Sequence, residues 1–365
     1  METNFKYLDN GLKVSVDWIS FTVTEIDSVD RVLSLFGYSS NDFTELPHGA
    51  HGYNSMLRLN GHSISVLYDG KEGMGIHVDV TGSSVLEFIR SFKETLKEDT
   101  PFGPGYEIDF DSSFMQALFS VILRVGHFTR FDLAIDDIGT SFFSTDDLCG
   151  LWANHCIVTK TRNMKNVVES VSGNVKIGHT VYFGSRKSDI FLRVYDKRLE
   201  QNRKLERARK PMISTPWTRW ELECKDSRAD AVARKLVDCI AFGEVVVGVL
   251  SHYFRVVQLD DSNRSRCTID ERWAAFINGV SPLKLYIPKE EKTLDDKKAW
   301  LEYQCGPTIA AVVISDFGSY GFLEKCVHSG ALRLTKGLCR LIAPCLDNPG
   351  FYGGGSYGDP CGCPS

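Results

Sequence analysis

Tyr195 stands out because it lies in an alternating segment, Thr180–Glu200, in which cationic side chains flank it. Residues two apart on a β-strand share a face, so Arg193, Tyr195 and Lys197 project together. A phenol has a pKa near 10, and neighbouring cations favour the phenolate, which is both a nucleophile and a good leaving group. The pattern predicts a catalytic Tyr195, assisted by Arg193 and Lys197, that attacks a phosphodiester. The alternative is a packing role, which is commoner for a tyrosine in an amphipathic strand.

Two further alternating segments, Arg130–Asp137 and Arg219–Glu223, carry carboxylates on one face. Carboxylate oxygens are preferred ligands of hard cations such as Mg²⁺ or Mn²⁺. Such an ion would hold a phosphate oxygen and stabilise the charge of an in-line transition state. The predicted metal ligands are Asp132, Asp136 and Glu221. The alternative is structural, with the carboxylates on a solvated face and paired with Arg130 and Arg219.

A basic run directly follows Tyr195. Lys197–Lys210 holds seven lysines and arginines against two glutamates, although the whole chain has a formal net charge of −5. Such a run is usually a solvated helix face, but beside a candidate nucleophile it favours a track for DNA phosphates. The turn Gly184–Ser188 adds further cations, and a guanidinium binds phosphate through two hydrogen bonds. The predicted DNA contacts are Arg186, Lys187, Arg198, Arg203, Lys204 and Arg207.

The elements that must position these residues indicate an α+β fold. Alternating, β-branched segments predict strands over 12–23, 57–68, 75–80, 128–137, 180–183 and 217–224, and a strand that ends near Tyr195. Amphipathic spacing predicts helices over 84–96, 114–125 and 145–155. From Arg228 onward helical patterns dominate, and from Pro344 a glycine-rich tail follows that is not expected to pack.

Composition narrows the class of protein. The chain has 365 residues, of which 43% are apolar and 24% charged, which is ordinary for a globular protein with a sizeable core. Its eleven cysteines lack paired Cys-x-x-Cys spacing, which argues against zinc ribbons and fingers. No signal-peptide pattern is visible, and the longest apolar stretch, Ile240–Leu250, is too short to span a bilayer. We therefore expect a cytoplasmic protein with reduced thiols. The role of Cys361 and Cys363 in the tail stays open.

Several segments occur in an order typical of a known family. They are Asp17–Phe21, Gly75–Gly82, RFDLAIDD, YFGSRKSD, RVYDK and RWELECK. In these segments the chain resembles the replication initiation factor family over about residues 14–245. That family contains initiators of rolling-circle plasmids, related relaxases of integrative conjugative elements, and initiators of filamentous phages. The stretch with Trp273 and Trp300 resembles the phage branch more than the plasmid branch.

The resemblance implies an antiparallel Rep-nuclease-like sheet with flanking helices, followed by a mostly helical C-terminal region. It also implies a rolling-circle replication initiator, a site-specific single-strand endonuclease and strand transferase. Tyr195 would form a 5′-phosphotyrosine link at the origin and leave a 3′ hydroxyl for a host polymerase, with a host helicase as a further partner. The expected domains are a Rep-type nicking domain over 1–245, a helical region over 246–345 and a Gly/Cys-rich tail over 346–365.

Alternative roles fit several of these residues. Glu223 shares the face of Glu221 and could replace it as a ligand. His77 and Asp79 also share a face, at a place where many tyrosine nickases have a His-hydrophobic-His metal motif, but a polar network explains this pair too. The alternatives for function are a relaxase of a conjugative element and a non-catalytic DNA-binding regulator on the same fold. Tyr195 together with carboxylates on two strands argues against the regulator. The origin sequence and any oligomeric state are not predicted.

Overall fold

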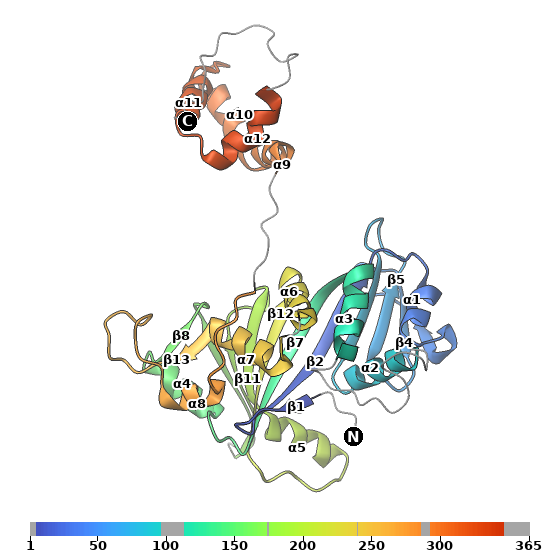
Figure 1. Ribbon diagram of the computed structural model, residues 1–365. Helices are drawn as coiled ribbons and strands as arrows, with labels where there is room; N and C mark the ends of the chain where they lie inside the picture. Colours follow the sequence, from blue (N-terminus) through green and yellow to red (C-terminus); the bar gives the residue numbers. More distant parts are fainter. Residues whose placement is uncertain (1–4, 96–112, 174, 239, 286–292, 347–365) are drawn as a thin grey trace. The chain divides into compact units, whose positions relative to one another are not determined.

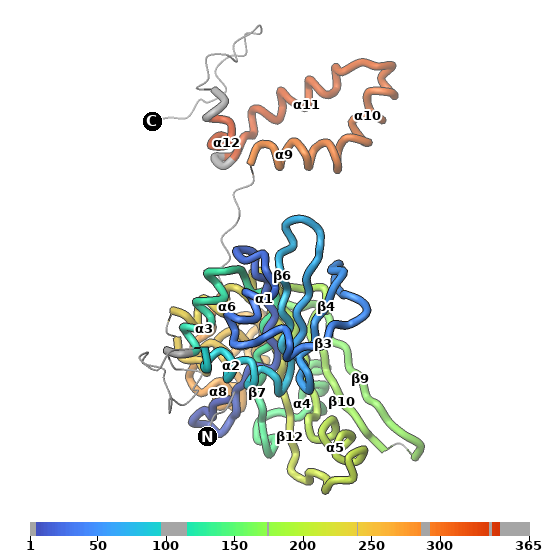
Figure 2. The backbone as a smooth tube through the Cα atoms, turned by 90° about the vertical axis from the view of Figure 1, so that its right-hand side faces the viewer, coloured from blue at the N-terminus to red at the C-terminus, as the bar shows by residue number. Residues whose placement is uncertain are grey.

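The computed structural model describes residues 5–95, 113–173, 175–238, 240–285 and 293–346 (Figures 1 and 2). Contacts divide the chain into two units, Met1–Ile287 and Pro288–Ser365. The first contains the sheet. The second, in its described part, consists of helical segments: α9 (Leu294–Trp300), a π-helical turn (Leu301–Cys305), α10 (Gly306–Ser315), α11 (Gly321–Ala331) and α12 (Lys336–Leu346). The expected glycine- and cysteine-rich tail lies almost entirely outside the described residues.

The first unit is built on an eleven-stranded antiparallel sheet. Its order is β3-β4-β5-β6-β2-β7-β12-β11-β10-β9, and β1 pairs with β2. The strands are β1 (Phe5–Tyr7), β2 (Lys13–Val23), β3 (Phe43–Leu46), β4 (Ser55–Leu59), β5 (Ile64–Tyr68), β6 (Ile76–Thr81), β7 (Gly126–Ile138), β9 (Met164–Val171), β10 (Val175–Phe183), β11 (Ile190–Asp196) and β12 (Trp217–Lys225). A separate pair joins β8 (Ile157–Thr159) to β13 (Phe254–Val256).

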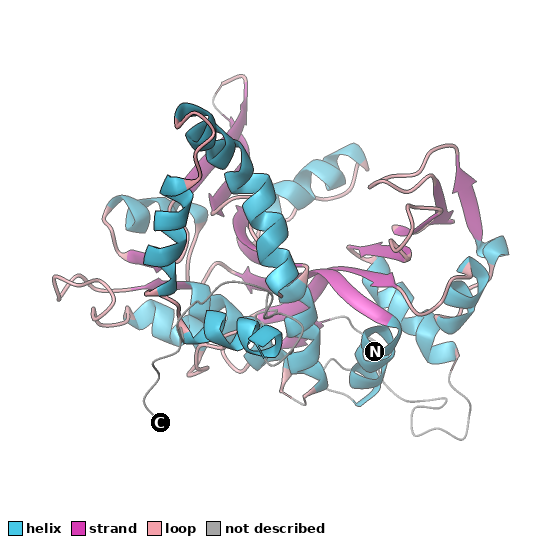
Figure 3. Ribbon diagram, turned by 90° about the horizontal axis from the view of Figure 1, so that it is seen from above, coloured by secondary structure: helices cyan, strands magenta, loops and turns pink. Residues whose placement is uncertain are grey.

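Helices flank this sheet (Figures 1 and 3). They are α1 (Val29–Leu35), α2 (Ser84–Glu94), α3 (Ser113–Val125), α4 (Thr145–Ala153), α5 (Lys197–Arg207), α6 (Ser227–Val237), α7 (Phe242–Tyr253) and α8 (Glu271–Ile277), with a short 3₁₀ turn at Ser40–Asp42. Helices α3, α6 and α7 contact β7 and bury its apolar residues, whereas α5 contacts β10 and β12. The predicted α+β class, with an antiparallel sheet and flanking helices, is confirmed.

The structure refines several sequence-based elements. The strand predicted over 57–68 is two strands, β4 and β5, because the chain turns at Gly61, which adopts a left-handed φ of 76°. The long strand β9 was not predicted. The predicted boundary at residue 245 lies inside α7. Trp273 and Phe276 of α8 are fully buried against Trp220 of β12, with ring centroids 5.9 and 5.1 Å apart. Aromatic packing therefore holds this later segment in the first unit.

The face that the alternation predicts to be polar is largely covered. Asp136 and Asp132 on β7 are 0% and 2% exposed, and Glu221 on β12 is 3% exposed. These strands lie at the centre of the sheet, so long side chains from both neighbouring strands close over each residue. A buried charge is costly unless it is paired and hydrogen-bonded. The partners of these carboxylates therefore decide what the face can do.

Candidate active site

Strand register brings the candidate residues into two adjacent rows. In the first row, Tyr195 of β11 lies opposite Arg219 of β12, which in turn lies opposite Asp136 of β7. In the second row, Arg193 lies opposite Glu221. Directly opposed residues on one face of an antiparallel pair have adjoining side chains. The sheet thus assembles a tyrosine, two arginines and two carboxylates from three strands.

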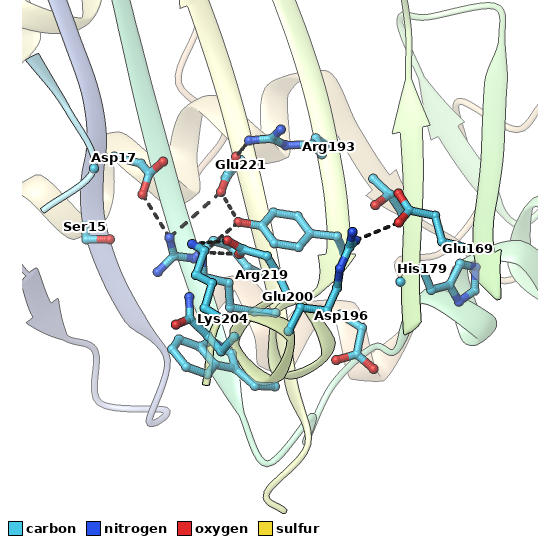
Figure 4. A pocket seen from close by; sticks show the side chains of 18 of the residues that line it. Ser15, Asp17, Glu169, His179, Arg193, Asp196, Glu200, Lys204, Arg219 and Glu221 are labelled. Carbon is cyan, nitrogen blue, oxygen red and sulfur yellow. Dashed lines mark hydrogen bonds and ion pairs between the residues drawn. The ribbon is translucent and has the colours of Figure 1, made fainter. Parts of the chain in front are cut away.

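Tyr195 is 9% exposed, and its hydroxyl is held by charged groups. The hydroxyl donates a hydrogen bond to Oε1 of Glu221, and Nζ of Lys197 donates to the same hydroxyl over 3.1 Å. The guanidinium of Arg193 binds Oε2 of Glu221. Figure 4 shows Arg193, Arg219 and Glu221 converging in this pocket. The structure therefore brings together the three predicted catalytic residues and one predicted metal ligand.

The resting state of Tyr195 differs from the expectation that its cationic neighbours favour the phenolate. Burial raises the pKa of Tyr195 well above its usual value, and the negative charge of Glu221 raises it further. Arg219 acts in the opposite direction but does not compensate. The side chain therefore rests as a neutral phenol, and its attack needs a proton acceptor.

The predicted metal ligands are each engaged by arginine. Arg130 binds Asp132 through Nε at 2.8 Å and Nη2 at 2.6 Å. Arg219 binds Asp136 through Nε at 2.6 Å and Nη2 at 2.7 Å, and Nε1 of Trp217 donates to the same carboxylate over 2.7 Å. Both oxygens of Glu221 are occupied by Arg193 and Tyr195.

In this arrangement the three carboxylates do not fit a shared metal site. No group of three or more His, Cys, Asp or Glu side chains in the described part of the chain is placed to hold an ion. For Asp132 and Asp136 the structure matches the alternative of pairing with Arg130 and Arg219. The carboxylates of these pairs are buried, however, and do not lie on a solvated face. Glu223 is also paired, with Arg130 at 3.1 Å and Lys225 at 2.8 Å.

Asp17 is a member of the site that the spacing argument missed. Nη1 of Arg219 binds its Oδ1 over 2.9 Å, so Arg219 links Asp17 to Asp136. The pairing of β2 with β7 shifts register between Val16 and Trp18, and Asp17 is the extra residue of this bulge. A bulge re-aims a side chain. The signal available in the sequence was the acidic residue at the start of the Asp17–Phe21 motif.

A polar cavity of about 710 Å³ adjoins Tyr195. Its volume lies in the range typical of ligand sites. It is enclosed by β2, β10, β11, β12 and α5. The charged and polar residues that line it include Lys13, Ser15, Asp17, His179, Arg193, Tyr195, Lys197, Glu200, Arg203, Lys204, Arg219 and Glu221. His179, a second missed residue, is held between Thr145 at 2.7 Å and Asn166 at 2.8 Å, and burial lowers its pKa.

The predicted DNA contacts fall into two places. Arg203 and Lys204 of α5 line the Tyr195 cavity, but Arg203 pairs with Glu169 at 2.7 Å and Lys204 with Glu200 at 2.5 Å. Arg198 pairs with Asp196 at 3.4 Å. Arg207 is exposed at the end of the helix.

Arg186 and Lys187 are exposed in the β10–β11 turn, at the opposite end of β11 from Tyr195. The seven steps along the chain from Ser188 to Tyr195 span about 23 Å at roughly 3.3 Å per residue. The position of the turn in the sequence suggested that it adjoins the tyrosine. In the structure it does not.

His77 and Asp79 form a polar network on β6, in keeping with the structural alternative. Nε2 of His77 lies 3.4 Å from Asp79, Thr22 bonds Nδ1 of His77 over 3.0 Å, and Ser20 donates to Asp79. Burial alone would raise the pKa of Asp79, but the hydrogen bonds from His77 and Ser20 outweigh it and hold that pKa at about 2.

With this fold and site, the chain belongs to the replication initiation factor family, whose model matches residues 126–325. The predicted family is thereby confirmed, and the preference for the phage branch stays a prediction. The chain is 29% identical over 312 residues to the Bacillus subtilis (strain 168) protein named "Putative DNA relaxase NicK", covering 85% of this chain and 83% of that protein.

A solved structure shares the fold. It is the rolling circle replication initiator protein from Geobacillus stearothermophilus, with a TM-score of 0.57 and 28% sequence identity, over 76% of this chain and 99% of that one. In the described residues no helix is long and apolar enough to cross a membrane.

Proposed function

We propose that this chain is a rolling-circle replication initiator that nicks one strand of a replication origin through Tyr195. The observation that carries the proposal is the Tyr195 hydroxyl, which bonds to Glu221 and Lys197 beside a polar cavity. Family membership and the similarity to a relaxase and to a rolling circle initiator support it. The chemistry and the residues that perform it are our proposal.

In the proposed reaction the Tyr195 oxygen attacks the scissile phosphorus and forms an oxygen–phosphorus bond. The phenolic proton passes to Glu221, which already accepts a hydrogen bond from it. The bond from phosphorus to the 3′ oxygen breaks, and this oxygen takes up a proton from solvent water, to which Glu221 returns the proton that it accepted, so that a free 3′ hydroxyl results. The products are a 5′-phosphotyrosine and a primer end. Reversal with another 3′ hydroxyl rejoins the strands, because phenolate is a good leaving group.

Two cations assist this step. Lys197, whose ammonium lies 3.1 Å from the Tyr195 oxygen, is placed to stabilise the negative charge that develops there. Arg193 orients Glu221 and lies over the tyrosine ring at 5.2 Å from its centroid. Both are fixed before DNA arrives, so little reorganisation is needed during attack.

We propose a dependence on Mg²⁺ or Mn²⁺ at the level of the family, and assign no ligands. Asp132, Asp136 and Glu221 are saturated by arginines and Tyr195 in this arrangement. No step of the reaction above therefore involves an ion. Nicking assays with EDTA, compared with assays in added Mg²⁺ or Mn²⁺, measure the dependence directly.

The proposed partners follow from the reaction. DNA enters the cavity as a single strand at the origin, a host polymerase extends the 3′ hydroxyl, and a host helicase separates the strands. A relaxase of a conjugative element is the second candidate, favoured by the similarity to NicK. The chemistry is the same for both. Neighbouring genes distinguish them, because a phage supplies coat and assembly genes and a conjugative element supplies a coupling ATPase and secretion channel.

The test is incubation of the protein with a supercoiled plasmid that carries the element's origin. We expect an open-circular product and a covalent protein–DNA adduct whose tryptic map places the nucleotide on Tyr195. An adduct on another tyrosine, or nicking without any adduct, would overturn the proposal.

A further inference from the structure

A second hollow, of about 370 Å³, lies at the far end of β11 from Tyr195 and takes no part in the proposed nicking step. Its lining residues come from the β8–β9 connection, the β10–β11 turn, the first turn of α6 and the end of α7. Lys160, Arg162 and Arg228 line it, and Asp189 is the one carboxylate among its described lining residues. Positive charge therefore dominates its wall.

Lys160 and Arg228 have neutral partners among the residues that the structure describes. Within the described ranges, none of Lys160, Arg162 and Arg228 has a carboxylate oxygen within ion-pair distance, in contrast to Arg203 and Lys204 on α5. Lys160 instead donates to Nε2 of His252 and lies 4.7 Å from the ring centroid of Tyr253. Arg228 donates to the carbonyl oxygen of Leu285 over 2.6 Å. Neutral groups thus position charges that stay available to an external anion.

The cations also act on one another. Burial lowers the pKa of the Lys160 ammonium, and the charges of Lys284 and Arg228 lower it further. The pKa of His252 is lowered by burial and then by Lys160 and Lys284. The repulsion between these neighbouring cations is reduced when an anion binds among them.

The remaining wall supplies donors suited to phosphate. Thr161, Asn163, Ser185 and Ser188 line the hollow with hydroxyl and amide groups, and such groups commonly contact phosphate oxygens. Position 184, where the turn meets this wall, requires a glycine. It has a φ of +94°, and a Cβ there would come within 2.9 Å of Cγ2 of Thr161.

The positive surface continues beyond the hollow. An adjoining hollow of about 770 Å³ shares Thr161 and Arg162, and adds His155 and Arg264. No carboxylate occurs among its described lining residues. Arg186 and Lys187 are exposed on the other side, in the β10–β11 turn. A series of phosphates fits this strip better than a single small anion does.

We propose that the hollow at Lys160, Arg162 and Arg228 binds backbone phosphates of the DNA duplex that flanks the nick, so that the protein holds its origin at two places. The proposal rests on the proposed function. Ile190, in the wall of the hollow, is five residues from Tyr195 along β11, a distance of about 17 Å at roughly 3.3 Å per residue. This corresponds to about five base pairs at 3.4 Å each.

The experiment compares Lys160→Gln/Arg162→Gln with Arg234→Gln/Lys235→Gln. The control pair removes the same charge from α6, where Arg234 pairs with Asp230 at 2.9 Å and Lys235 with Asp238 at 3.6 Å. Binding of a labelled origin duplex is titrated at several salt concentrations, after thermal unfolding has shown that each variant is folded. Adduct formation by the wild type, measured separately, tests the proposed function independently.

We expect the Lys160/Arg162 variant to flatten the slope of log affinity against log salt by about 1–2, since each lost phosphate contact removes roughly 0.9. The control should keep the wild-type slope within about 0.5. Equal slopes for the two variants would overturn the proposal even if the wild type forms the adduct. A second outcome would also overturn the proposal. In it, inorganic phosphate stabilises the wild type but not the Lys160/Arg162 variant, and the two proteins bind DNA equally. The hollow would then be a site for a free anion.

Discussion

The hydroxyl of Tyr195 donates a hydrogen bond to one carboxylate oxygen of Glu221, while Arg193 holds the other oxygen of the same group. The candidate nucleophile therefore has a proton acceptor in place before DNA binds. The same contact, added to burial, raises the pKa of Tyr195, so the tyrosine rests protonated and Glu221 is not free to act as a metal ligand. Substitutions of Tyr195 and Glu221 therefore test the proposed chemistry directly.

Tyr195→Phe should abolish the covalent adduct and nicking, because only the attacking oxygen is removed. The free energy of unfolding should change by about 1 kcal/mol, the net value of one hydrogen bond. Tyr182→Phe is the matched control on the neighbouring strand, where Tyr182 stacks on Phe191. Gel assays detect the covalent adduct in both variants. An adduct that persists in the Tyr195 variant and disappears in the Tyr182 variant would reassign the nucleophile.

Glu221→Gln should slow adduct formation by about 10²–10⁴-fold, the range typical of general-base catalysis. Glutamine keeps the shape but cannot take the phenolic proton. Glu223→Gln is the control, since Glu223 lies on the same strand and pairs with Arg130 and Lys225 without contacting Tyr195. Single-turnover rates on an origin oligonucleotide provide the comparison. Equal losses in the two variants would remove the special role of Glu221.

Asp136→Asn should destabilise the protein. Asp136 is fully buried and neutralises Arg219, and loss of one partner from a buried ion pair costs about 3–5 kcal/mol. Asp146→Asn, at a carboxylate that is 74% exposed and pairs with Lys176, should cost less than about 1 kcal/mol. Urea unfolding measures both. A stable Asp136 variant whose lost activity returns with excess Mn²⁺ would instead support a metal-ligand role.

Asp79 should make stability depend on pH in the acid range. Its pKa of about 2 in the folded chain lies below the value near 3.9 of an unfolded aspartate. The unfolded state therefore takes up this proton first, and the stabilisation, present above about pH 4, is lost as the pH falls towards 2. The loss amounts to roughly 2 kcal/mol. Asp79→Asn should reduce this dependence in unfolding curves between pH 5 and 2, and an unchanged curve would contradict it.

The cations of α5 should contribute unequally to DNA binding. Arg207 is exposed, and Arg207→Gln should flatten the salt dependence of binding by about 0.7–0.9. Arg203→Gln should have a smaller effect, because Glu169 already compensates its charge at 2.7 Å. Glu169→Gln removes the ion-pair partner of Arg203 and should steepen the salt dependence of DNA binding. Origin preference should stay constant in all three variants, since phosphate contacts carry no sequence information. A loss of preference at constant affinity would mean that this helix contacts bases.

The sequence by itself determined the class of fold and the composition of the polar face. Strand periodicity of two places Arg193 and Tyr195 on one side whatever their surroundings, and the ordered motifs indicate the family. Lys197, expected on the same strand face, is instead the first residue of α5 and reaches the Tyr195 hydroxyl from there. The assignment of a side chain to a strand face is local, because it depends only on the chain within a few residues, and the order of the motifs can be read directly along the chain. They were sufficient to single out Tyr195 and to place Glu221 on a polar strand face.

Only the tertiary structure decided which charges meet. Strand register sets Arg219 opposite Asp136 and Glu221 opposite Arg193, and a bulge turns Asp17 toward Arg219. Register depends on pairing between strands far apart in the chain, so periodicity alone cannot assign a carboxylate to an ion or to an arginine. The hollow at Lys160 and Arg228 likewise arises because distant segments pack together. Their separation in the sequence gives no sign that they meet.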